Sequence, residues 1–76
     1  MSLKSRIETV LFVIARSVTI KEIAEILHEE ESDIEEAMLD LIMDYSSRDG
    51  ALEINDENGY ILQVKEDYSD IVEKLC

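Results

Sequence analysis

One apolar stripe in the middle of the chain constrains the fold more than any other feature. Its residues recur at i, i+3, i+4, i+7, i+8 and i+11, which is the spacing of one face of an α-helix. The stripe consists of Ile34, Ala37, Met38, Leu41, Ile42 and Tyr45. The pattern predicts a helix that begins at Ser32 and ends near Arg48, because Ser32 and Glu35 have the spacing of a capping box.

Two shorter helical segments precede this helix. The first is predicted over residues 2–15 with Ser2 as its cap, and the second begins at a capping-box pair formed by Thr19 and Glu22. The apolar stripe of the first segment consists of Leu3, Ile7, Val10, Leu11 and Ile14. His28 falls in the last turn of the second helix, and residues 29–31 form a solvated acidic connector.

After Gly50 the apolar pattern changes from the period of a helix to the period of a strand. Apolar and polar residues alternate over residues 52–55 and again over residues 60–64, and turn-forming residues separate the two runs. The Asn58-Gly59 pair can take the positive φ of a tight turn, so the two runs predict a β-hairpin. A final amphipathic helix is indicated by Tyr68, Ile71, Val72 and Leu75.

Three helices followed by a hairpin is the order of a winged helix-turn-helix. We therefore expect a mostly α fold with a small β-hairpin (α+β), in which three helices, a wing and a C-terminal helix form one domain over residues 1–76. The link at residues 16–18 can add a third strand. An irregular α+β domain of another topology is the alternative. No helix-ending residue follows Leu75, which indicates a fragment of a longer native chain.

The charge of the chain disfavours the ligand that such a fold usually binds. The net charge is −12, from 19 acidic and 7 basic residues spread along the sequence, so nucleic acid and anionic membrane are both poor partners. The face of the third helix opposite the stripe consists of Glu35, Glu36, Leu39, Asp40 and Met43. Phosphates and base edges call for Lys, Arg, Asn or Gln at this place. Arg48, at the helix end, is the only residue that could contribute a cation to such contacts. The hairpin tip is also acidic.

Residues suited to catalysis or metal binding are scarce. The one histidine, His28, and the one cysteine, Cys76, have no visible partner for nucleophilic catalysis. Neighbouring carboxylates at residues 29–31 point in different directions, and no phosphate-binding glycine loop exists. We expect no catalytic residue, cofactor, metal or small-molecule substrate. A single cysteine suits the reducing cytoplasm, and no apolar run approaches the about 20 residues of a membrane span.

Apolar residues that lie off the predicted stripes are candidate contact residues. Phe12 and Val13 lie outside the stripe of the first helix, and so small a domain has little interior to cover them, which favours an interface. Leu39 and Met43 lie one turn apart on the acidic face of the third helix. They fit a second contact patch, but they equally fit a cover over the core or scattered surface residues.

Several segments together resemble the N-terminal part of segregation and condensation protein B. They are Ile7-Glu8, Val10-Leu11-Phe12, Val18-Thr19, Glu22-Ile23-Ala24, Leu52-Glu53 and, most specifically, Gly59-Tyr60-Ile61-Leu62-Gln63. The chain departs from that family at Ala15-Arg16-Ser17, where the family often has a Gly-x-Pro turn.

The resemblance implies the first of two winged-helix domains in a non-catalytic subunit of a bacterial SMC–kleisin complex, which condenses and segregates chromosomes. It implies a homodimer formed through this domain, a kleisin held mainly by the second domain, an SMC protein in the same complex, and a cytoplasmic location on the nucleoid. Val10, Leu11 and Phe12 carry over as interface residues. Val13, Leu39 and Met43 are assigned to an interface from the apolar pattern described above alone, without support from the resemblance. The alternative function is a transcription regulator whose DNA contacts lie outside this chain, which rests on fold alone.

Overall fold

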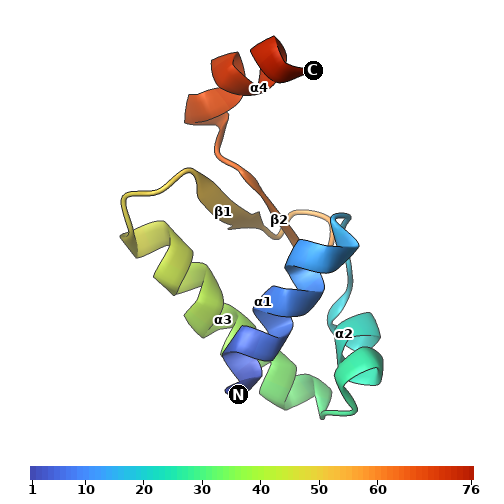
Figure 1. The fold of residues 1–76 in the computed structure, drawn as a ribbon. Coiled ribbons are helices and arrows are strands. Elements are labelled where there is room, and N and C mark those ends of the chain that lie inside the picture. The colour runs from blue at the N-terminus through green and yellow to red at the C-terminus, as the bar shows by residue number, and fades with distance from the viewer.

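The computed structural model describes residues 1–76 as four α-helices and one antiparallel hairpin. The elements are α1 (Leu3–Ile14), α2 (Ile20–Leu27), α3 (Glu31–Ser47), β1 (Leu52–Asn55), β2 (Ile61–Val64), the short 3-10 helix η1 (Glu66–Tyr68) and α4 (Ser69–Leu75). In Figure 1, α1 packs across α3, α2 lies beside them, and the hairpin closes one end of the three-helix body. The predicted types and order of the elements are confirmed.

The first two helices begin at the capping residues that the sequence predicted. The N–H of Ser5 donates to Oγ of Ser2 at 3.1 Å. In α2, the N–H of Glu22 donates to Oγ1 of Thr19 at 3.1 Å, and the N–H of Thr19 donates to the Glu22 carboxylate at 3.0 Å. Each cap satisfies N–H groups that have no partner within the helix.

The predicted start of α3 is wrong by one residue, and its predicted cap is not formed. The helix begins at Glu31, so Ser32 lies within the first turn, and the N-cap residue Glu30 makes no side-chain cap hydrogen bond. Acidic side chains at Glu31 and Asp33 occupy this turn. Negative charge at a helix N-terminus is stabilised by the helix dipole, which explains a start without a capping side chain.

Two helices end on residues in the left-handed conformation. Ala15 has φ 54° and ends α1, and His28 has φ 56° and ends α2. His28 is therefore the cap that follows the helix rather than a member of its last turn. A left-handed conformation costs a residue with a Cβ about 1–2 kcal/mol. Ala15 stands where the resembled family often has glycine, and it takes the left-handed conformation that glycine adopts more readily.

The hairpin places the apolar residues of both strands on one face. Leu52 pairs with Val64 and Ile54 pairs with Leu62, so these four side chains lie on the same side of the sheet. Ile54 is buried against the helices, whereas Leu52 and Val64 are exposed. Only the end of this apolar face formed by Leu52 and Val64 therefore lies outside the core.

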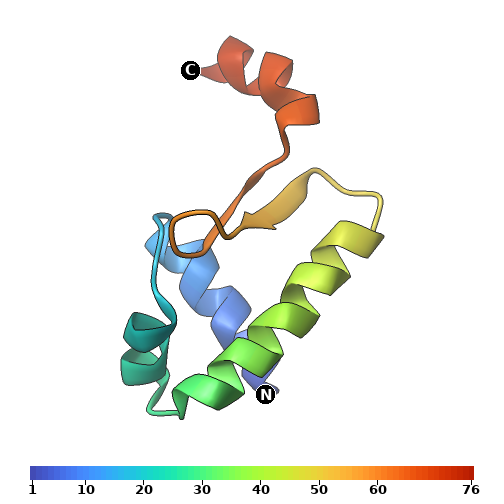
Figure 2. The same ribbon diagram turned by 180° about the vertical axis from the view of Figure 1, so that it is seen from behind.

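The final helix stands apart from the body. Figures 1 and 2 show α4 beyond the far end of the hairpin, away from α1, α2 and α3. None of its residues is buried, and Ile71, Val72 and Leu75 are exposed. The predicted helix exists, but its apolar residues contribute nothing to the core.

The link after α1 is tied to the hairpin by one antiparallel bridge. The N–H of Val18 donates to the carbonyl of Tyr60 at 2.9 Å, and the N–H of Tyr60 donates back at 2.7 Å. The expected third strand is therefore reduced to a single residue pair. Gly59 precedes the bridge with φ 80°, and a Cβ at this position would lie 2.9 Å from the Val18 carbonyl oxygen.

A single apolar cluster forms the core, and it draws mainly on α1 and α3. Its ten buried residues are Ile7, Leu11, Val18, Ile23, Ala24, Ile34, Met38, Leu41, Tyr45 and Ile54. Tyr45 also carries a polar link, because its hydroxyl donates to the Glu8 carboxylate on α1. The Arg48 guanidinium lies 4.4 Å from the centre of the Tyr45 ring. Burial, followed by the Glu8 carboxylate, raises the pKa of Tyr45 to about 12.

Replacing Gly59 with alanine is expected to lower the free energy of unfolding by about 1–3 kcal/mol. The added methyl group meets the Val18 carbonyl, and positive φ is strained for alanine. Urea denaturation measures the change. Gly50→Ala is the matched control, because a Cβ there meets only the Arg48 side chain at 3.6 Å. Equal decreases in the free energy of unfolding of the two variants would contradict the importance of the bridge.

Tyr45 should make the fold sensitive to alkali. Its pKa is raised from 10.0 to about 12 on folding, so its contribution is complete below pH 10 and is lost as the pH rises through 12. The contribution is at most about 3 kcal/mol. The difference in free energy of unfolding between wild type and Tyr45→Phe should therefore shrink from pH 9 to pH 12. A difference that stays constant over this range would contradict the assignment.

Candidate protein-interaction surfaces

The structure places most of the predicted interface residues at the surface. Phe12, Val13, Leu39 and Met43 are 73%, 75%, 63% and 65% exposed. Val10 is partly buried against the core cluster. Leu11 is 1% exposed, so its side chain belongs to the core and is not available to a partner in this structure.

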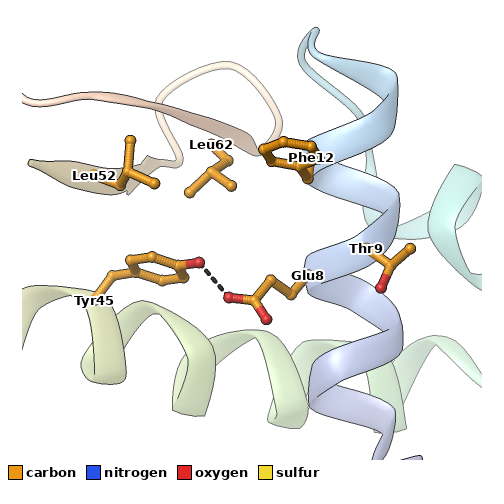
Figure 3. Close-up of a pocket in the computed structure, with 6 residues that line it drawn as sticks. All are labelled: Glu8, Thr9, Phe12, Tyr45, Leu52 and Leu62. Atoms are coloured by element: carbon orange, nitrogen blue, oxygen red, sulfur yellow. Dashed lines mark hydrogen bonds between the residues drawn. The ribbon is translucent and has the colours of Figure 1, made fainter.

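Two hollows flank the exposed side of α1. The first has a volume of about 440 Å³ and lies between α1, α3 and the hairpin (Figure 3). It is lined by Glu8, Thr9, Phe12, Tyr45, Leu52 and Leu62. The second has a volume of about 310 Å³ and lies between α1 and α2. It is lined by Thr9, Val10, Val13, Ile14 and Ile26. We call the surface formed by Thr9, Phe12, Val13 and the two hollows the α1 face.

The α1 face is almost free of charge. Among the residues that line its two hollows, Glu8 is the only charged one, and its carboxylate accepts the hydrogen bond of the Tyr45 hydroxyl. In Figure 3 the Glu8 and Tyr45 side chains point toward each other beneath the ring of Phe12. An apolar partner can therefore cover this face without leaving several charges desolvated.

A second exposed surface lies on α3, on the side that faces away from the core. Leu39 and Met43 are its apolar residues, and Glu35, Glu36 and Asp40 are its carboxylates; we call these five residues the α3 face. The buried residues Ile34, Met38, Leu41 and Tyr45 occupy the opposite side of the same helix. The three salt bridges of the structure join Lys4 to Asp44, Arg6 to Glu29 and Arg16 to Glu22. None of these salt bridges includes a carboxylate of the α3 face, and the nearby Lys4, which also interacts with Asp40, is bound to Asp44.

Neither the histidine nor the cysteine lies in a site. His28 caps α2, Cys76 is exposed at the chain end, and no three His, Cys, Asp or Glu residues gather as metal ligands would. None of the helices combines the length and the apolar character that crossing a bilayer demands.

Sequence reasoning found the exposed apolar residues of α1 but not the hollows beside them. Leu52 and Leu62 belong to the alternating segments that predict the hairpin, and Ile26 belongs to the predicted second helix. Each of these side chains is only partly covered, and Ile26 is half exposed. The period of an apolar stripe predicts which side of a helix or strand is buried. The hollows between two elements depend instead on how those elements pack against each other.

The comparisons with known proteins agree with this geometry. The family model of segregation and condensation complex subunit ScpB matches residues 5–76. A crystal structure of a dimer of the ScpB N-terminal domain complexed with a ScpA peptide is 19% identical, with a TM-score of 0.88 over 100% of this chain and 93% of that chain. ScpB from Mycobacterium tuberculosis is 22% identical, with a TM-score of 0.86 over 96% of this chain.

These two likenesses confirm the predicted winged-helix fold. This chain spans 46% of the chain of Mycobacterium tuberculosis ScpB. The search among curated proteins returned no match. Since the family model covers all but the first four residues, the chain belongs to the family of the segregation and condensation complex subunit ScpB.

Proposed function

We propose that this domain serves the ScpB subunit by pairing with a second copy and by binding the kleisin of the SMC complex. ScpB is a non-catalytic subunit for chromosome segregation and condensation. The observation that carries the proposal is the α1 face, on which Phe12 and Val13 stand exposed beside two apolar hollows. The structurally similar ScpB N-terminal domain is a dimer complexed with a ScpA peptide.

Charge favours the α1 face over the α3 face for contact between two copies. Each copy carries a net charge of −12, so two copies repel each other, and this repulsion is weakest where the contacting surfaces carry few carboxylates. The α1 face offers one carboxylate, from Glu8, whereas the α3 face would bring three unpaired carboxylates of each copy together. Like charges placed together at an interface cost several kcal/mol.

The shape of the α1 face also suits a twofold dimer. In such a dimer the same patch is used by both copies, so a residue that projects must be matched by a hollow on the same patch. Phe12 projects from α1 and borders the hollow formed with Leu52 and Leu62. In this proposal Phe12 of each copy packs at the hollow of the other, and Val10 and Val13 extend the contact toward α2.

The remaining parts of the proposal concern the setting of the domain. It is the first of two winged-helix domains in a longer native chain, and the subunit is cytoplasmic and bound to the nucleoid through its complex. The coverage of about half of Mycobacterium tuberculosis ScpB and the position of the match in the ScpB N-terminal domain support this arrangement.

Introducing a charge on the α1 face is expected to break the dimer. Phe12→Glu should raise the dimer dissociation constant by about 30-fold or more, because an aromatic hot spot contributes about 2 kcal/mol or more to binding. Val13→Glu should act in the same direction. Analytical ultracentrifugation at micromolar concentration measures the change, and circular dichroism confirms that the exposed substitutions leave the fold intact.

Leu39→Glu is the matched control for these variants. It places the same charge at a residue of similar exposure on the α3 face, and it should leave self-association unchanged. A wild-type chain that sediments as a monomer at every concentration, or a Phe12→Glu variant that pairs like wild type, would refute the proposed interface.

Duplex DNA is expected not to bind this domain. The α3 helix offers Glu35, Glu36 and Asp40 where phosphate contacts would require Lys or Arg. A mobility-shift titration with a short duplex at about 0.15 M salt should show free DNA throughout. Saturable binding that weakens as salt increases would instead favour the transcription-regulator alternative.

A further inference from the structure

The α3 face combines exposed apolar side chains with carboxylates beside them. Leu39 and Met43 lie one turn apart and are both about two-thirds exposed, so they form a short apolar ridge along the helix. Glu35 and Glu36 lie one turn before Leu39, and Asp40 lies one turn before Met43. The ridge is therefore bordered by carboxylates on its N-terminal side and along one flank.

An acidic hollow adjoins this ridge. It has a volume of about 230 Å³ and lies between the start of α1 and the first half of α3. Its lining consists of Leu3, Asp33, Glu36, Ala37 and Asp40. Glu36 and Asp40 thus border both the hollow and the apolar ridge. The nearby Lys4 is bonded to Asp44 at 2.7 Å, and no salt bridge of the chain includes Asp33, Glu36 or Asp40.

The charge pattern selects the chemistry of a partner. A second copy of this chain would bring its own net charge of −12 to three unpaired carboxylates, and duplex DNA would bring phosphates. A segment with apolar side chains beside Lys or Arg would cover the ridge and pair with the carboxylates at the same time. Complementary charge of this kind increases the association rate and rejects acidic competitors.

We infer that the α3 face binds a basic, amphipathic segment of the kleisin, with apolar side chains on Leu39 and Met43 and a Lys or Arg in the hollow between Glu36 and Asp40. The choice of the kleisin rests on the proposed function. The same partner then contacts a surface different from the α1 face, so one dimer can present two α3 faces to kleisin.

The test measures binding of the purified cognate kleisin to the chain by isothermal titration calorimetry. Two variants address the two parts of the surface, namely the double substitution Glu36→Lys with Asp40→Lys and the double substitution Leu39→Ala with Met43→Ala. Each should raise the dissociation constant at least tenfold, which corresponds to about 1.4 kcal/mol. Sedimentation of both variants should still show the wild-type dimer, since neither changes the α1 face.

The matched control is Glu25→Lys with Glu57→Lys, which reverses two exposed charges on α2 and at the hairpin tip and changes the net charge equally. It should bind kleisin within about threefold of wild type, a difference below about 0.7 kcal/mol. If wild type binds kleisin and all three variants bind equally well, the inference is wrong while the proposed function stands. If wild type does not bind kleisin, the kleisin part of the proposed function fails, and this inference fails with it.

Discussion

The packing of α1 against α3 is the interaction on which the rest of the molecule depends. Six of the ten buried residues belong to these two helices, namely Ile7, Leu11, Ile34, Met38, Leu41 and Tyr45. A domain of 76 residues has little further interior, so each helix can bury one side only. The two exposed faces are the outer sides of the same two helices. Burial of the inner sides of α1 and α3 thus determines which of their residues stay exposed. Phe12, Val13, Leu39 and Met43 are outside the core for that reason.

Local patterns in the sequence were sufficient to predict the elements and the exposure of the apolar residues that lie off the stripes. The α3 stripe, the capping box of α2 and the turn at Gly59 depend on residues close together in the chain, and the structure reproduces each of them. The predicted cap at Ser32 was wrong because an acidic first turn stabilises the helix start without it. The hollows beside α1 and the reduction of the third strand to one bridge depend on contacts between distant segments. Spacing along the chain does not determine such contacts.

The distribution of charge distinguishes the two outer faces and underlies the different roles that we propose for them. Both have two large exposed apolar residues, so hydrophobicity alone does not distinguish them. The α1 face has one carboxylate, and that carboxylate accepts a hydrogen bond from Tyr45. The α3 face has three carboxylates, and none of them forms a salt bridge. A winged-helix domain normally reads DNA with the helix that here carries these carboxylates. We propose that the acidic helix binds polypeptide instead.

The excess of 12 negative charges has a consequence for how the assembly responds to its medium. Counterions shorten the range of electrostatic forces, to about 10 Å at 0.1 M salt. Screening weakens the mutual repulsion of two acidic copies, and it equally weakens the attraction of an acidic copy for a basic segment. More electrolyte therefore tightens pairing at the α1 face and loosens capture at the α3 face, so a single solution variable moves the two proposed contacts in opposite directions.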